Sequence, residues 1–222
     1  PMPRQTLFAL HGHTPIQHIN QHTIRMSISL DDITGVILAG GMGRRMGGVD
    51  KGLRNFKNAP LALHAMMRLN GQVGDICINA NRNIGVYEGF GVEVVCDIQP
   101  DYAGPLAGMQ AALAHTNLPY LVTVPCDVPM FPLNLVEKLS APFEKNVGLM
   151  LTVASTKGRH HPVFCMMRTE LLPNMEEFLR KGGRKIDAWY ANIPHEAVEF
   201  DDEAAFHNVN TLEELKELEQ KS

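Results

Sequence analysis

The chain has 222 residues, a formal net charge of −4 and a pI of about 6.2. This length is enough for one sizeable domain with a core of its own. The acidic balance excludes the overall positive field that draws proteins to nucleic acids, so we expect no nucleic-acid partner. No apolar run approaches the roughly 18 residues of a transmembrane helix, so we expect no membrane span.

The four cysteines show no spacing typical of a metal site. They are Cys77, Cys96, Cys126 and Cys165, and no two of them form a C-x-x-C pair. Each lies in or beside an apolar run. We therefore expect reduced, buried thiols in a cytoplasmic protein rather than zinc ligands or disulfides.

Residues 1–30 differ from the rest of the chain. They are polar, rich in histidine and without clear periodicity, and their apolar stretch at residues 7–10 is too short for a signal peptide. We expect a disordered leader over residues 1–30, with Met26 as a candidate translation start. A single domain is expected over residues 31–222.

Short apolar runs alternate with helical patterns from residue 33 onward. The first predicted strands are residues 33–38, 76–80, 92–96 and 121–124. The first predicted helices are residues 60–69, 105–115 and 133–139. This alternation predicts an α/β fold with three layers and a doubly wound, mostly parallel sheet. Ligands of such sheets bind at the carboxyl ends of the strands.

The last third of the chain is less regular. We predict strands at residues 147–153, 163–167 and 195–200, with a polar hairpin-like segment at residues 155–161. Helices are predicted at residues 169–181 and 184–190. Thr211 is expected to cap a final helix, because Glu214 stands at the capping-box position three residues later.

A glycine-rich, basic loop follows the first predicted strand. Residues 40–51 read GGMGRRMGGVDK, with Arg44 and Arg45 inside the loop and Lys51 at its end. Glycine lets backbone N–H groups turn towards an anion, and the cations neutralise it. Lys51 is followed by glycine, so the G-x-x-x-x-G-K-[ST] template fails, and the G-x-G-x-x-G pattern lacks its third glycine. The loop predicts phosphate binding by another arrangement.

Three motifs in this region carry a resemblance to a known family. LAGG at residues 38–41, RRMGG at residues 44–48 and DKG at residues 50–52 resemble the signature of nucleotidyltransferases. The RRMGG-x-DKG form most resembles the molybdenum cofactor guanylyltransferases, and the resemblance covers nearly all of the chain after the leader. It implies a Rossmann-like nucleotidyltransferase fold.

The resemblance also implies a reaction. The expected enzyme transfers GMP from GTP to the molybdopterin of molybdenum cofactor and forms the guanine dinucleotide cofactor and pyrophosphate. One alternative is a related transferase that uses CTP or a sugar-phosphate acceptor. Another is a non-catalytic protein that binds a nucleotide or the cofactor. Molybdoenzyme assembly proteins are further possible partners of an enzyme of this family.

Polar residues after three later strands match the nucleotide site of the family. The resemblance implies nucleotide contacts for Asn79 and Asp97 and a Mg²⁺ ligand in Asp127, and residues 104–108, GPLAG, resemble a second nucleotide-facing loop. Asn79 is also a turn former and Asp97 a possible cap. A carboxylate that faces phosphates is best explained by a divalent cation.

The resemblance assigns roles to these residues. Lys51, Arg45 and Asp127 are the expected catalytic residues, because they would hold the triphosphate, neutralise the leaving group and bind Mg²⁺. The remaining expected nucleotide contacts are Leu38, Ala39, Gly40 and Gly41.

Two segments in the second half match the acceptor side of the family. Asn208 and Asn210, in an N-V-N-T segment, would project to one side of an extended chain, and the family uses this segment near the pterin. Residues 159–162, RHHP, resemble a polar segment before a strand. Their adjacent histidines should face opposite sides, which argues against a shared metal site. Arg184 and Lys185 fit either an acceptor-phosphate contact or an exposed helix face.

Overall fold

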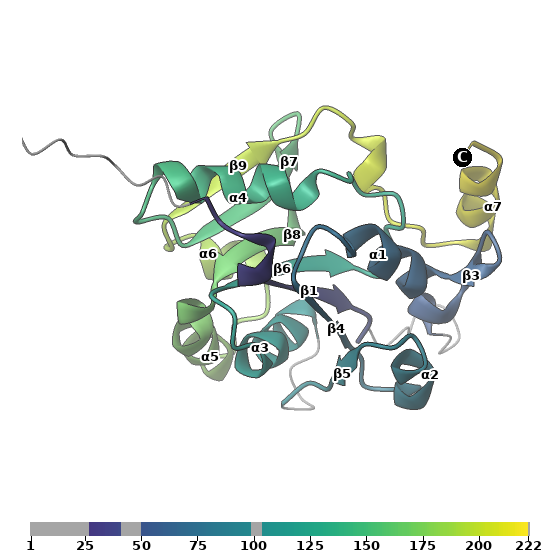
Figure 1. Cartoon of the computed structure of the whole chain (residues 1–222), viewed down its shortest axis with the longest axis horizontal. Helices are drawn as coiled ribbons and strands as arrows, with labels where there is room; N and C mark the ends of the chain where they lie inside the picture. The colour runs from purple at the N-terminus through teal and green to yellow at the C-terminus, as the bar shows by residue number, and fades with distance from the viewer. Residues whose placement is uncertain (1–26, 41–49, 99–103, 222) are drawn as a thin grey trace, which may run out of the picture.

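The computed structural model describes residues 27–40, 50–98 and 104–221 (Figure 1). A seven-stranded sheet forms the centre of this part of the chain. Its strands are β1 (Ile33–Leu38), β4 (Asp75–Asn79), β5 (Glu93–Val95), β6 (Tyr120–Pro125), β7 (Leu151–Thr156), β8 (Arg159–Arg168) and β9 (His195–Glu199). The strand order is β5–β4–β1–β6–β8–β7–β9. Only β8 runs antiparallel to its neighbours in this sheet, and all the other pairings are parallel.

Helices cover both faces of the sheet (Figure 1). One face carries α1 (Leu61–Leu69) and α4 (Leu135–Lys145), and the other carries α3 (Pro105–His115), α5 (Leu172–Arg180) and α6 (Ile186–Tyr190). The short helix α2 (Ile84–Glu88) packs beside β5. The predicted three-layer, mostly parallel α/β fold is therefore confirmed.

Strand β1 lies between β4 and β6 inside the sheet, and its side chains pack into the helical layers on both faces. Ile33 and Ile37 belong to the core under α1 and α4, while Val36 and Leu38 belong to the core under α3. Gly35 lies against α1, because a Cβ at this position would come within 2.5 Å of Leu69 Cδ2. Burial on both faces explains why β1 is a continuous apolar run without polar alternation.

Some predicted boundaries were wrong. The strand expected at residues 147–153 begins only at Leu151, and the side chain of Val147 is 91% exposed. The helix expected at residues 133–139 begins at Leu135 and continues to Lys145. Helix α2 was missed, because five residues are too few to display a helical period.

The predicted hairpin-like segment is a tight hairpin between β7 and β8. Its turn consists of Lys157 and Gly158, whose φ angles are 49° and 76°. Two residues with positive φ make a turn whose twist matches that of the flanking strands. The R-H-H-P sequence therefore lies inside β8, not before a strand as the resemblance suggested.

The two ends of the described chain are both packed. Ile28 packs against the core cluster that the residues of α1 and α4 help to form, while residues 1–26 of the predicted leader lie outside the described residues. At the other end, the capping box of α7 (Leu212–Lys221) is confirmed. The N–H of Glu214 donates to Thr211 Oγ1 over 3.0 Å, and the N–H of Thr211 donates to Glu214 Oε2 over 3.1 Å.

Helix α7 docks on a small hairpin formed by β2 (Asn55–Phe56) and β3 (Ala59–Pro60). Leu215 of α7 belongs to a core cluster with Phe56, Leu61 and Val209. The hairpin follows Lys51 directly in the chain. The C-terminal helix is thus held next to the end of the glycine-rich loop.

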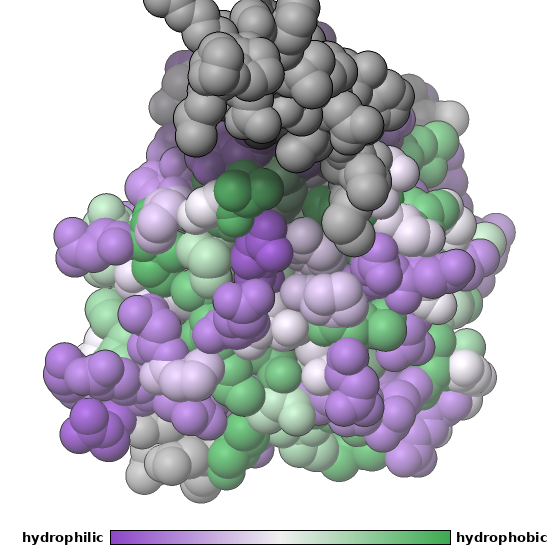
Figure 2. All heavy atoms as spheres, turned by 60° about the vertical axis from the view of Figure 1, so that its left-hand side comes forward, coloured by the Kyte–Doolittle hydropathy of each residue, from purple (hydrophilic) through white to green (hydrophobic). Residues whose placement is uncertain are grey.

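The outer surface mixes polar and apolar side chains. On the face that Figure 2 presents, the described residues alternate between hydrophilic and hydrophobic without a continuous apolar field. Among the described residues, none of the helices is long and apolar enough to cross a membrane.

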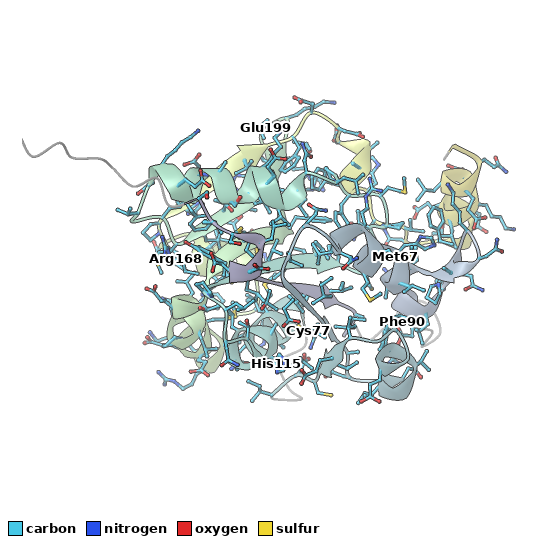
Figure 3. The ribbon with its side chains drawn as sticks, in the orientation of Figure 1. Met67, Cys77, Phe90, His115, Arg168 and Glu199 are labelled. Atoms are coloured by element: carbon cyan, nitrogen blue, oxygen red, sulfur yellow. The ribbon has the colours of Figure 1, made fainter. Side chains whose placement is uncertain are left out.

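The packing of α1 against β1 predicts a large cost for Leu69→Ala. Leu69 is 0% exposed and lies under Gly35, so truncation should leave a cavity and lower the free energy of unfolding by ~2–5 kcal/mol. The matched control is Met67→Ala on the same helix, labelled in Figure 3, because Met67 is 63% exposed. Urea denaturation measures both variants, and equal losses would contradict the assigned orientation of α1.

Candidate active site

Three parallel strands end at one edge of the sheet and bring the predicted residues together. Backbone hydrogen bonds continue the sheet past the strand ends. The Ala39 N–H donates to the Asn79 carbonyl over 2.8 Å, and the Cys126 N–H donates to the Leu38 carbonyl over 3.2 Å. Leu38 and Ala39 are buried, so their side chains pack inwards and Gly40 is the first partly exposed residue after β1.

Asn79 is the buried centre of a polar cluster. Its side chain is 2% exposed, and its Nδ2 donates to the Val95 carbonyl over 3.1 Å and to Asp97 Oδ1 over 2.8 Å. Asn81 Nδ2 donates to the other carboxylate oxygen of Asp97 over 2.9 Å, and the Asp97 N–H donates back to Asn81 Oδ1 over 2.9 Å. The Asp97 carboxylate is thus held by amide donors on both of its oxygens.

Two glycines make room for the Asn79 side chain. A Cβ on Gly40 would come within 2.8 Å of Asn79 Oδ1, and a Cβ on Gly108 of α3 would overlap the same oxygen. Gly104, just before α3, has a φ of 137°, a conformation that few side chains tolerate. The glycines of residues 104–108 therefore serve a turn and a close approach of α3 to the end of β4.

Lys51, Asp127 and Asn210 meet at the same edge. Lys51 Nζ lies 3.3 Å from Asp127 Oδ2 and donates to Asn210 Oδ1 over 2.9 Å. The backbone holds this arrangement, because the N–H of Val209 donates to the Asp127 carbonyl over 2.8 Å. Asn208 Nδ2 lies 3.5 Å from Asp127 Oδ2. The two asparagines of the N-V-N-T segment therefore both reach the Lys51–Asp127 ion pair.

A cavity of about 620 Å³ opens beside this ion pair. Asn208 and Asn210 line it, and so do Arg159, His161 and Phe206. Its size falls within the ~300–1,000 Å³ of small-molecule sites. The site edge thus offers a second compartment on the far side of Asp127 from Asn79.

The adjacent histidines of β8 face opposite sides, as predicted. His160 Nδ1 lies 3.0 Å from the hydroxyl of Tyr190 on α6, whereas His161 stacks on Phe206 with ring centroids 4.6 Å apart. His161 Nε2 also lies 2.7 Å from Thr156 Oγ1. Burial is the main cause that lowers the pKa of His161, so its imidazole is neutral at pH 7.

The thiol beside Asp127 is not a nucleophile. Cys126 is buried, and burial together with the charge of Asp127 raises the pKa of its thiol far above neutrality. All four cysteines are free, but Cys96 is exposed, so the expectation of burial was wrong for that residue. Cys96 is exposed because it follows the last residue of β5 and lies outside the sheet.

Several predicted or missed residues complete the inventory of the site. Gly41 and Arg45 lie outside the described residues, as does Arg44. Arg184 Nη1 donates to the backbone carbonyls of Leu179 and Gly183, at the end of α5. Asn81 stands in the same strand-end motif as Asn79 but was given no site role from the sequence; the structure shows that it holds the Asp97 carboxylate.

Comparison with known proteins gives this geometry a context. The family model of the MobA-like NTP transferase domain matches residues 35–196. The molybdenum cofactor guanylyltransferase of Bordetella petrii is 52% identical over 194 residues, which cover 86% of this chain and 99% of the relative. The molybdenum cofactor guanylyltransferase of Ralstonia nicotianae is 51% identical over 199 residues, covering 86% and 98%.

Solved structures agree on the fold. Molybdopterin-guanine dinucleotide biosynthesis protein A from Archaeoglobus fulgidus superposes with a TM-score of 0.69 at 22% identity, covering 85% of this chain and 97% of that one. A CMP:2-keto-3-deoxy-manno-octonic acid synthetase complexed with CTP gives a TM-score of 0.67 at 14% identity, covering 85% and 96%. About half of the aligned residues are identical to two curated relatives over nearly their whole length, so the chain belongs to the molybdenum cofactor guanylyltransferase family.

Proposed function

We propose that this protein transfers GMP from GTP to the molybdopterin of molybdenum cofactor and releases pyrophosphate. The observation that carries this proposal is the meeting of Lys51, Asp127 and Asn210 beside the Asn79–Asp97 cluster, in a chain of this family. The Asn79–Asp97 cluster suits the nucleoside, and the group of Lys51, Asp127 and Asn210 suits the charged phosphates.

The chemistry requires little covalent help from the protein. An oxygen of the acceptor phosphate attacks the α-phosphorus of GTP in line with the departing pyrophosphate. The acceptor phosphate is already ionised at neutral pH, so no general base is needed. Positioning and charge neutralisation supply the rate enhancement. Lys51 neutralises charge on the triphosphate, and we assign the same role to Arg45.

The residues around Asp127 fit a bound Mg²⁺. Mg²⁺ in phosphoryl-transfer sites is held by one or two carboxylates together with substrate phosphates and water. The Asp127 carboxylate and the Asn210 amide oxygen are hard oxygen donors on either side of Lys51 Nζ, at 3.3 Å and 2.9 Å. When bound there, Mg²⁺ supplies polarisation of the α-phosphate.

The donor and acceptor have separate compartments in this proposal. The nucleoside of GTP lies at Asn79 and Asp97, which Asn81 and two glycines hold in place. The pterin lies on the side of the cavity beside Asn208 and Asn210. Lys51 and Asp127 stand between them, where the α-phosphate must be for transfer.

The proposal also covers the cellular compartment and the protein partners. The four free thiols support a reducing compartment, so we assign the protein to the cytoplasm. Molybdoenzyme assembly proteins are the corresponding protein partners, because they would receive the dinucleotide cofactor.

A pyrophosphate-release assay tests the function. Purified protein is supplied with molybdopterin, Mg²⁺ and either GTP, CTP or ATP, and we expect release with GTP at a kcat/KM above those of the other nucleotides. A preference for CTP would overturn the guanylyl assignment. GTP binding without release, even with the acceptor present, would instead support a binding protein.

Replacement of the proposed metal ligand should abolish Mg²⁺-dependent turnover. For Asp127→Asn we expect kcat to fall by about 100-fold or more, since several kcal/mol of charge stabilisation are lost. Asp75→Asn is the matched control, because Asp75 is an exposed carboxylate at the opposite, amino end of β4. Near-normal turnover of Asp127→Asn over a Mg²⁺ titration would remove Asp127 from the mechanism.

The glycine that faces Asn79 offers a test of the nucleoside site. Gly108→Ala should displace the Asn79 amide, weaken GTP binding and lower the free energy of unfolding by ~1–3 kcal/mol. Gly85→Ala in α2 is the control, because a Cβ there has no atom within 4 Å. Calorimetry and urea denaturation measure the two effects. Unchanged GTP affinity in Gly108→Ala would show that Asn79 takes no part in binding.

A further inference from the structure

The turn that carries Lys51 depends on the residue before it. Asp50 caps the three-residue 3₁₀ turn Lys51–Leu53, and its Oδ1 accepts the N–H of Gly52 over 3.1 Å. Wherever the Asp50 carboxylate is held, the backbone of Lys51 is held too. The ammonium of Lys51 then reaches Asp127 from that fixed point.

Asp50 is itself anchored by a distant segment. The hydroxyl of Tyr87 donates to Asp50 Oδ1 over 2.7 Å, and Asn83 Nδ2 donates to Asp50 Oδ2 over 2.9 Å. Both donors come from α2 and the residue that precedes it, which follow β4. Helix α2 therefore contributes two hydrogen bonds to the carboxylate that positions Lys51.

Tyr87 is buried in a way that serves this contact. The residue is 0% exposed, and its ring packs edge-on against Phe90, labelled in Figure 3, with centroids 5.7 Å apart. Burial raises the pKa of the Tyr87 hydroxyl far above neutrality, and the hydrogen bond to Asp50 raises it further. The hydroxyl therefore keeps its proton and remains a donor.

The contact between Tyr87 and Asp50 also explains why residue 52 of the D-K-G motif is glycine. A Cβ on Gly52 would overlap the hydroxyl oxygen of Tyr87 and lie 3.3 Å from the Cβ of Ala62. Any larger residue at this position would push the phenol away from Asp50. The motif thus encodes a carboxylate, the functional cation and the space through which a buried hydroxyl reaches that carboxylate.

We propose that Tyr87 is a positioning residue that acts through Asp50 to set the Lys51 ammonium against the triphosphate of the donor nucleotide. The inference rests on the proposed function, because it takes Lys51 as a ligand of GTP. If Tyr87 only filled the core, the effect of its substitution would be the same whether or not Lys51 were present.

A double-mutant cycle separates these two roles. The variants are Tyr87→Phe, Lys51→Ala and the combination of both, and the readout is the GTP dissociation constant with Mg²⁺, together with KM and kcat. Hydrogen bonds to charged groups have a large effect, so we expect Tyr87→Phe to weaken GTP binding by about 5–20-fold. In the Lys51→Ala background the same substitution should have no further effect.

The opposite result is equally defined. If Tyr87→Phe weakens binding by the same factor in both backgrounds, or not at all, the positioning role is overturned. Tyr120→Phe is the matched control, because it removes a phenolic hydroxyl at the amino end of β6 and should leave GTP binding unchanged. Failure of the wild-type protein to bind GTP would count against the proposed function, not against this inference.

Asn83→Gly provides an independent arm if Tyr87→Phe folds poorly. Asn83 is exposed and has a φ of 53°, which glycine adopts without strain, so the substitution removes only the second donor to Asp50. We expect a smaller loss of GTP affinity that also disappears with Lys51→Ala. A loss that persists without Lys51 would contradict the proposal.

Discussion

A buried amide, Asn79, ties together the polar cluster at the ends of β4 and β5. A polar side chain that is only 2% exposed must find partners inside the protein, and it finds them in the Val95 carbonyl and the Asp97 carboxylate. Its oxygen lies where neither Gly40 nor Gly108 could carry a Cβ. The ends of β1, β4 and β5 and the start of α3 are thereby fixed relative to one another, before any substrate binds.

The second half of the site is held by chain segments that lie far apart in the sequence. Val209 is fastened to the Asp127 backbone, and α7 packs on the hairpin that follows Lys51. Lys51 and the N-V-N-T segment are consequently held by the same pair of elements, the β2–β3 hairpin and α7. This explains how Lys51 can contact Asp127 and Asn210 together, although they are separated from it by 76 and 159 positions.

Much of this arrangement was predictable from the sequence, and the limits have physical causes. Buried parallel strands give continuous apolar runs, and their carboxyl ends share an edge. The strand pattern therefore agreed with the family resemblance, which had singled out Asn79 and Asp127. The end of β7 and the start of β8 could not be predicted in this way, because a two-residue turn with a lysine at positive φ carries no unique signal. The roles of Asp50 and Asn81 were not predicted, because they depend on partners 37 and 16 positions away in the sequence.

The reversed direction of β8 has a consequence for how this fold can diversify. Because β8 runs against its neighbours, its first residues arrive at the same edge as the last residues of β6. One half of this edge is formed by the ends of β4, β1 and β6. The other half is formed by the start of β8 and the segment before α7. Lys51 contacts one residue from each half, Asp127 and Asn210. Under the proposed assignment, the residues for the acceptor and those for the nucleoside lie on different chain segments, so one set can change without altering the backbone that carries the other.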